Sequence, residues 1–200
     1  MESADPDGLL AIGGDLSVER LECAYQQGIF PWFSGKIPMW YSPDPRFVLF
    51  PDELIVSKSM KQVLRSGNFQ FTINQSFEEV ISACSKIGRD GQIGTWITDE
   101  MIEAYTRLYE KGQAVSAETW HQGQLVGGLY GVRVGKVFCG ESMFSLMSNA
   151  SKFAFIQFVE HLQKDGIELI DCQVYTSHLS SLGGRMIPRD SYIRFLTANS

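Results

Sequence analysis

The segment from Leu169 to Tyr175 carries the polar residues best suited to chemistry, because Asp171 and Gln173 stand inside an otherwise apolar strand. Successive side chains along a strand point to opposite faces, which puts Asp171 and Gln173 on one face and Cys172 on the other. Burying a carboxylate and an amide costs free energy unless both find hydrogen-bond partners. The pair therefore indicates either a structural polar network or the polar groups of a functional site.

A second carboxylate in similar surroundings is Glu141, which lies in the mostly apolar segment from Val137 to Phe144. Gly140 precedes it, and a glycine within a strand lets another backbone or a ligand approach closely. If this segment neighbours the strand that holds Asp171, the polar side chains of both strands line one cleft. Two carboxylates in such a cleft would attract a cationic substrate.

Several routine chemistries are disfavoured by motifs that the sequence lacks. It contains neither the P-loop pattern G-x-x-x-x-G-K-[ST] nor the dinucleotide pattern G-x-G-x-x-G. Its 3 histidines do not have metal-ligand spacing, so we expect no zinc site. Cys172 and His178 could act as nucleophile and base, but Cys172 is predicted to face the core, away from Asp171. The 4 cysteines, none in a C-x-x-C pair, are expected to be buried reduced thiols of a cytosolic protein.

Hydrophobic periodicity and capping signals predict the elements that must position these residues. Helices are expected over residues 17–27, 57–66, from 76, 98–111 and 149–165, with short ones at 177–182 and 189–196. Strands are expected over 69–73, 115–120, 125–134, 137–144 and 167–175, with a hairpin turn at Gly135 and Lys136. This order predicts an α+β fold with a central mixed sheet. It is compatible with the acyltransferase fold of many N-acetyltransferases, although a fold alone does not establish function.

The N-terminal region is expected to consist mainly of loops around one helix, and these loops hold large aromatic side chains. The segments 30–33 and 40–46 combine proline with aromatic residues, and each proline restricts the backbone around it. The two segments form either a small aromatic core under irregular loops or the wall of an apolar pocket.

Composition limits the remaining classes of protein. Hydrophobic residues make up 44% of the 200 residues, which is enough for a core and excludes disorder as the main state. The longest stretch without Asp, Glu, Lys or Arg, residues 119–132, is too short for a membrane span, and the acidic N-terminus is unlike a signal peptide. There are 17 Lys and Arg against 23 Asp and Glu, and the net charge of −6 disfavours a generic DNA-coating protein.

One basic stripe contrasts with this acidic composition. Lys58, Lys61 and Arg65 are predicted to lie on one face of the helix expected over residues 57–66. The stripe is either a solvated helix face or a contact for phosphate groups.

Seven sequence blocks follow one another along nearly the whole chain: DGLLAIGGDLS (7–17), GIFPWF (28–33), WYSPDPR (40–46), GTWI (94–97), LVGGLYG (125–131), GESMFS (140–145) and LIDCQ (169–173). In this order they closely resemble the bacterial leucyl/phenylalanyl-tRNA–protein transferases. The resemblance implies transfer of Leu or Phe, and also Met, from aminoacyl-tRNA to the N-terminal Lys or Arg of a protein. This transfer marks the protein for degradation by the N-end rule.

The same resemblance implies the organisation and partners of the chain. We expect a small N-terminal α/β domain over residues 1–45 and a catalytic domain with an acetyltransferase-like (GNAT) mixed sheet over residues 46–200. The expected partners are aminoacyl-tRNA and proteins that begin with Lys or Arg. The resemblance also implies a cytoplasmic enzyme that uses neither metal nor coenzyme and does not bind a membrane. A monomer is the default expectation.

By position in the family's motifs, Asp171 and Gln173 match a catalytic pair and Glu141 matches an active-site glutamate. The family proposal has Gln173 accept a proton from the attacking α-amine. Because an amide is a very weak base, we expect Gln173 instead to orient the amine through its carbonyl oxygen. Asp171 would fix the amide and supply negative potential.

The resemblance also assigns residues to the two parts of the aminoacyl-tRNA substrate. Positions around an apolar pocket for the aminoacyl side chain or the terminal adenosine are matched by Trp32, Trp96 and Phe138, with Tyr105 as a further candidate. The family's basic cluster for the tRNA acceptor arm falls on Lys58, Lys61 and Arg65.

Two other functions remain as alternatives. A coenzyme A-dependent N-acetyltransferase would need a glycine-rich pyrophosphate loop between a strand and the next helix, and residues 144–151 lack one. A catalytically silent module that binds tRNA or peptides is the other alternative, against which the presence of Asp171, Gln173 and Glu141 argues.

Overall fold

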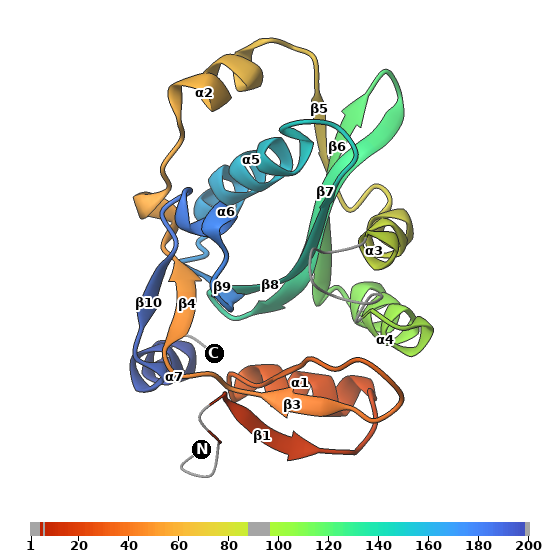
Figure 1. Ribbon diagram of the computed structural model, residues 1–200, viewed down its shortest axis with the longest axis vertical. Coiled ribbons are helices and arrows are strands. Elements are labelled where there is room, and N and C mark those ends of the chain that lie inside the picture. The colour runs from red at the N-terminus through yellow and green to blue at the C-terminus, as the bar shows by residue number, and fades with distance from the viewer. Residues whose placement is uncertain (1–4, 6, 88–96, 199–200) are drawn as a thin grey trace.

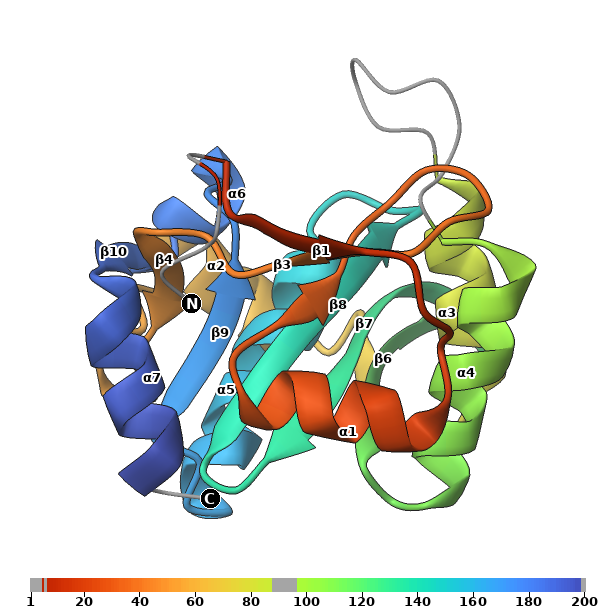
Figure 2. The ribbon, with the colours of Figure 1, turned by 90° about the horizontal axis from the view of Figure 1, so that it is seen from below.

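The computed structural model describes residues 5, 7–87 and 97–198, which form two β-sheets with helices packed around them (Figure 1). The smaller sheet is antiparallel, with the strand order β1-β3-β2. Its strands are β1 (Leu9–Ile12), β2 (Phe30–Pro31) and β3 (Met39–Tyr41). Helix α1 (Val18–Gln26) connects β1 to β2 and lies beside this sheet (Figure 2).

The larger sheet has the strand order β10-β4-β9-β8-β7-β6-β5. Its strands are β4 (Arg46–Leu49), β5 (Gln70–Ile73), β6 (Ala114–His121), β7 (Gln124–Val134), β8 (Val137–Ser145), β9 (Leu169–Gln173) and β10 (Arg185–Ile187). Neighbouring strands are antiparallel except β8 and β9, which are parallel, so the sheet is mixed.

Local sequence signals explain where the longer helices begin and end. The further helices are α2 (Lys58–Arg65), α3 (Phe77–Lys86), α4 (Asp99–Glu110), α5 (Ala150–Lys164), α6 (Ser177–Ser180) and α7 (Arg189–Ala198). The Ser57 hydroxyl accepts from the backbone N–H of Met60, and the Thr98 hydroxyl accepts from that of Met101, so both residues cap a helix N-terminus. Gly112, which follows α4, has a φ of 75°, a backbone conformation that glycine adopts without strain.

The larger sheet separates two hydrophobic cores. One core packs side chains of α1, α3, α4 and α7 against one face, and the other packs α2 and α5 against the opposite face. Strand alternation assigns each sheet residue to a core. On β4, for example, Val48 belongs to the first core, and Phe47 and Leu49 belong to the second.

The parallel pairing of β8 with β9 is short. It begins where Val137 pairs with Leu169 and ends where Cys139 pairs with Asp171. Beyond these residues the two strands separate, although β8 continues to Ser145. The polar residues singled out in the sequence therefore lie at the point where the larger sheet opens.

The predicted α+β class with a mixed sheet is confirmed, and each expected helix and strand lies within two residues of its expected ends. The interpretation of segments 30–33 and 40–46 as loops was wrong, because they contribute β2, β3 and the first residue of β4. Strands β1 and β10 were also missed. These strands have two to four residues and lie next to prolines or glycines, so no alternating pattern long enough to identify them is present.

None of the helices within the described residues is both long enough and apolar enough to span a lipid bilayer.

Candidate active site

A largely apolar cavity of about 480 Å³ lies where β8 and β9 separate. Its wall takes side chains from both cores and from the small sheet, among them Phe30, Trp32, Phe138, Met143, Phe155 and Ile170. The polar residues that line it include Glu141 on β8 and Gln173 at the end of β9. Apolar walls with a few placed polar groups are typical of pockets for small ligands.

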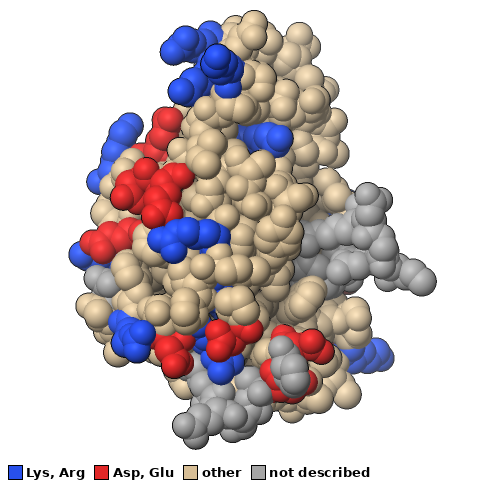
Figure 3. Space-filling model, turned by 60° about the vertical axis from the view of Figure 1, so that its left-hand side comes forward, with Lys and Arg blue, Asp and Glu red and all other residues tan. Residues whose placement is uncertain are grey.

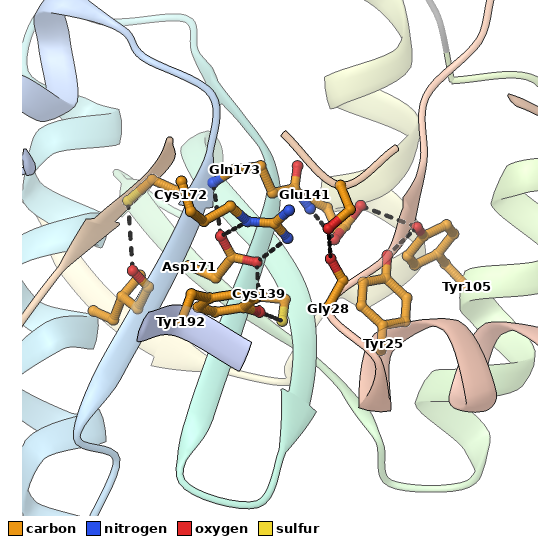
Figure 4. A network of polar contacts seen from close by, with 12 residues as sticks. Tyr25, Gly28, Tyr105, Cys139, Glu141, Asp171, Cys172, Gln173 and Tyr192 are labelled. Carbon is orange, nitrogen blue, oxygen red and sulfur yellow. Dashed lines mark hydrogen bonds and ion pairs between the residues drawn. The ribbon is translucent and has the colours of Figure 1, made fainter. Parts of the chain in front are cut away.

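Glu141 and Gln173 are joined directly across the opening between the strands (Figure 4). The Nε2 of Gln173 donates to Oε1 of Glu141 over 2.9 Å, and the Tyr105 hydroxyl donates to Oε2 over 3.0 Å. The Tyr25 hydroxyl of α1 in turn bonds that of Tyr105. Among the described residues none donates a hydrogen bond to the amide oxygen of Gln173, so this acceptor is available to a ligand.

Burial changes the acidity of Glu141. Removal from water raises the pKa of this carboxyl to about 7, and the negative charge of Asp171 acts in the same direction. Hydrogen bonds from Tyr25, Tyr105 and Gln173 oppose the rise. The result is a carboxyl group that exchanges its proton near neutral pH, which is the range in which a general base is most effective.

A buried ion pair lies behind these two residues. Arg46 of β4 binds Asp171 of β9 with both arms, Nε to Oδ1 over 2.8 Å and Nη2 to Oδ2 over 2.6 Å. Both side chains are buried, with 1% and 0% of their surface exposed. The Tyr192 hydroxyl donates to Oδ2 over 2.9 Å and the backbone N–H of Gln173 donates to Oδ1 over 2.9 Å. Asp171 therefore accepts four hydrogen bonds, which saturates a carboxylate.

Gln173 has an unusual backbone conformation. Its φ is 64°, in the left-handed region that residues other than glycine rarely adopt. The pairing of β9 with β4 is irregular next to it, because Gln173 pairs with Phe47 whereas Asp171 pairs with Val48, so Cys172 is an extra residue. Strained residues of this kind persist only where the surroundings hold them. The hydrogen bond from its N–H to Asp171 is one such restraint.

The structure brings Asp171, Gln173 and Glu141 into one network, as the sequence predicts (Figure 4). It does not place them equally, because Glu141 and Gln173 line the cavity and Asp171 does not. Asp171 is completely buried, and a hydrogen bond joins its carboxylate to the backbone N–H of Gln173, which lines the cavity.

The four predicted pocket residues have different positions. Phe138 is buried in the cavity wall, and Trp32 lines the cavity with 36% of its surface exposed. Tyr105 does not line the cavity and instead supports Glu141 from behind. Trp96 lies outside the described residues.

The basic stripe lies apart from the cavity, on the exposed side of α2. Lys58, Lys61 and Arg65 are all exposed. Figure 3 shows Lys and Arg side chains gathered at the top of the molecule, the end at which α2 lies in Figure 1.

Cys172 belongs to the second core, as strand alternation predicts, but it also lines the cavity. Burial raises the pKa of its thiol well above the ordinary value, which disfavours the thiolate that a nucleophile needs. His178 also lines the cavity, and burial together with the positive charge of Lys152 lowers the pKa of its imidazole. No hydrogen bond joins Cys172 to His178 within the described residues.

Sequence reasoning missed the residues that support the site, above all Arg46, Tyr192 and Tyr25. The signal for Arg46 is a charged residue directly before the apolar residues 47–49, but the sequence analysis assigns Arg46 to the loop segment 40–46 and predicts no strand over 46–49. Nothing in the sequence placed Tyr192 of α7 or Tyr25 of α1 beside the polar strands. The described residues contain no group of three or more His, Cys, Asp or Glu side chains that could hold a metal ion.

Comparison with known proteins gives matches over most of the chain. A model of the leucyl/phenylalanyl-tRNA protein transferase N-terminal domain matches residues 14–44, and a model of leucyl/phenylalanyl-tRNA protein transferase matches residues 48–197. The leucyl/phenylalanyl-tRNA–protein transferase of Flavobacterium johnsoniae is 56% identical over 197 residues, or 98% of this chain and 93% of that protein. The transferase of that name from Syntrophus aciditrophicus is 58% identical over 187 residues, or 93% of this chain and 78% of that protein.

Among solved structures, a GCN5-related N-acetyltransferase-like protein from Streptococcus suis is similar to this chain. It has 14% sequence identity and a TM-score of 0.41, and the match covers 84% of this chain and 63% of that one.

The raised pKa of Glu141 predicts how stability depends on pH. Folding raises the pKa of this carboxyl from 4.5 to about 7, so between these values the folded state binds more protons than the unfolded state. The contribution of Glu141 to the free energy of unfolding therefore falls as pH rises through this window and is constant above it. At roughly 1.4 kcal/mol per pH unit the loss is roughly 3 kcal/mol. Urea denaturation from pH 4.5 to pH 8 should show this loss in the wild type and not in Glu141→Gln.

The matched control for this measurement is Glu118→Gln. Glu118 is also a fully buried glutamate, held by the hydroxyls of Thr72 and Ser116 on the β5 and β6 side of the sheet. The Glu118→Gln variant should keep the pH-dependent loss. An equal loss in Glu141→Gln and in the wild type would contradict the assignment of the raised pKa to Glu141.

Proposed function

The chain belongs to the leucyl/phenylalanyl-tRNA–protein transferase family, and from this premise we propose that it moves Leu, Phe or Met from aminoacyl-tRNA to the α-amine of an N-terminal Lys or Arg. Like its relatives, the chain is an aminoacyltransferase. One observation carries the residue-level part of the proposal: Gln173 and Glu141 are hydrogen-bonded to each other at the wall of a largely apolar cavity.

The cavity would receive the side chain of the transferred amino acid. Phe138, Met143 and Ile170 give it an apolar wall without a charged group other than Glu141 among the described lining residues. Flexible or flat side chains such as those of Leu, Met and Phe can fill such a space. Each methylene contributes only about 1–3 kcal/mol of discrimination, so the rejection of Val or Ile depends on the shape of the wall.

Gln173 would orient the attacking amine, and Glu141 would take its proton. The substrate ester is already activated, so the reaction needs mainly a neutral amine held against the ester carbonyl carbon. The free amide oxygen of Gln173 can accept a hydrogen bond from the amine N–H and orient its lone pair. Glu141 can take the proton, because its pKa of about 7 lies near that of an α-amino group. A new C–N bond then forms, the bond to the ribose oxygen breaks, and that oxygen takes a proton as it leaves.

Asp171 would act through Gln173 rather than on the substrate. Its carboxylate is fully buried, is saturated with hydrogen bonds and does not line the cavity. Its contact with the reaction is the hydrogen bond to the Gln173 backbone. Asp171→Ala would also leave Arg46 as a buried charge without its partner, which typically lowers stability by about 3–5 kcal/mol. Gln173→Ala is therefore the cleaner test of the catalytic pair.

The same proposal assigns the domains, the tRNA contact and the cellular location of the enzyme. We propose residues 1–45 as a small domain and residues 46–200 as the catalytic domain. Phe30 and Trp32 of the first range line the cavity together with residues of the second. The exposed stripe Lys58, Lys61 and Arg65 would contact tRNA phosphates. We place the enzyme in the cytoplasm, where aminoacyl-tRNA is made, as a monomer without metal or coenzyme.

The reaction is tested by transfer of radiolabelled Leu from Leu-tRNA to a protein that begins with Arg, beside the same protein beginning with Ala. Label should appear on the Arg protein alone, and Gln173→Ala should reduce the rate at least tenfold while its circular dichroism spectrum is unchanged. Equal labelling of both acceptors would refute the acceptor rule. Wild-type transfer by Gln173→Ala would refute the role of the amide.

The tRNA contact is tested by charge reversal on α2. The double variant Lys58→Glu/Lys61→Glu should bind Leu-tRNA roughly tenfold more weakly or worse, and the slope of log affinity against log salt should fall by about 2. Lys136→Glu/Lys164→Glu makes the same charge change away from α2, at the β7–β8 turn and the end of α5, and serves as the control. Equal affinities of the two double variants would show that the stripe is only a solvated helix face.

A further inference from the structure

Arg46 is a buried cation without a direct contact to the cavity, and the proposed reaction does not use it. It is the first residue of β4, which lies beside β9 in the larger sheet. Only 1% of its side chain is exposed. Burial disfavours its charge, but Asp171 holds the pKa of the guanidinium above the ordinary value. A fully buried ion pair adds little to stability compared with an apolar pair, so its presence beside a site calls for another explanation.

The two arms of Arg46 reach different oxygens of Asp171. The Nε atom bonds Oδ1, which is the oxygen that accepts the N–H of Gln173. The Nη2 atom bonds Oδ2, which also accepts from Tyr192. The planar fork thus fixes the rotation of the carboxylate, and this rotation aims Oδ1 at the Gln173 backbone.

Aromatic rings hold the guanidinium itself. The centres of the Phe30 ring and of the Tyr192 ring each lie 4.7 Å from its central carbon, so the guanidinium makes two cation–π contacts. Phe30 comes from β2 of the small sheet and also lines the cavity, whereas Tyr192 comes from α7 near the C-terminus. Arg46 therefore connects one cavity wall to the ion pair behind Gln173.

Gln173 needs such a restraint because its backbone is strained. A φ of 64° is unfavourable for a glutamine, and the chain leaves the sheet directly after this residue. Without the hydrogen bond from its N–H to Oδ1 of Asp171, the residue could relax to an extended conformation. The side-chain amide would then move away from Glu141, to which it is now bonded.

We propose that Arg46 is a positioning residue of the transfer reaction: its fork fixes Asp171, Asp171 fixes the strained backbone of Gln173, and Gln173 is thereby held against Glu141 at the cavity. The proposal rests on the proposed function, because it assigns Arg46 a part in the same reaction. It differs from a purely structural role, in which the loss of Arg46 would affect folding and not the reaction of the folded protein.

The first test is Arg46→Lys. Lysine keeps the positive charge beside Asp171, but a single ammonium group cannot hold both carboxylate oxygens in the geometry of the fork. In the variant, kcat for Leu transfer should fall at least tenfold, and KM for Leu-tRNA should stay within twofold of the wild type. Glu118→Gln, a buried variant outside the site, should keep wild-type kcat. Rates are measured well below the melting temperature of each variant, so that only folded protein is compared.

A double-mutant cycle with Gln173→Ala separates positioning from a general loss of stability. If Arg46 acts through Gln173, Arg46→Lys/Gln173→Ala should be no slower than Gln173→Ala alone. If the two losses multiply, or if Arg46→Lys keeps wild-type kcat, the proposal is overturned.

A crystal structure of Arg46→Lys gives a readout that does not depend on activity. We expect the φ of Gln173 to leave the left-handed region and its amide to lose the hydrogen bond to Glu141. An unchanged Gln173 would overturn the proposal even if kcat had fallen. If the wild type itself transfers no Leu, the proposed function fails, and the crystal structure still tests whether Arg46 positions Gln173.

Discussion

The ion pair between Arg46 and Asp171 is the interaction on which the site depends. Its charges are placed where β4, β9, α7 and the small sheet meet, so parts of the chain far apart in the sequence share one buried contact. Burying two charges is favourable only with close geometry and well-satisfied hydrogen bonds. Here the two charged groups are joined by two short hydrogen bonds and Asp171 accepts four in all, whereas Nη1 of Arg46 has no partner among the described residues. A contact with these requirements tolerates few arrangements of its surroundings, which suits a site that must hold a strained residue.

The polar groups at and behind the cavity differ in their access to it. Asp171 is enclosed and saturated, so it can only support, whereas Gln173 and Glu141 reach the cavity wall. Burial of Glu141 raises the pKa of its carboxyl to about 7, so this group exchanges its proton at a pH where an exposed glutamate stays ionised. The separation of β8 from β9 gives these groups access to an apolar space that can hold a side chain. The fold thus places the carboxyl group of Glu141, the amide of Gln173 and a largely apolar cavity within one opening of the sheet.

The main helices, the long strands and the polar residues at the cavity could be predicted from the sequence. The residues that hold those polar residues in place could not. Periodicity located the helices and the long strands, and alternation correctly joined Asp171 to Gln173 and set Cys172 on the other face. The short strand β4 was missed because four residues after a proline show no period, and Arg46 was missed with it. Gln173 lines the cavity and Asp171 does not, and this difference depends on the bulge in β9 and on the left-handed φ of Gln173. No local sequence pattern predicts either feature. The contacts of Tyr25, Tyr105 and Tyr192 depend on tertiary packing. Trp96 stays a prediction.

The most direct test of this account is the structure of the protein bound to a stable analogue of its substrate, an adenosine that carries leucine through an amide in place of the ester. The account predicts the leucyl side chain in the cavity against Phe138 and Ile170, with the acyl group beside the amide of Gln173 and the Arg46–Asp171 pair intact behind it. A leucyl side chain outside this cavity, or a Gln173 that turns away from the acyl group, would contradict the assignment of the site.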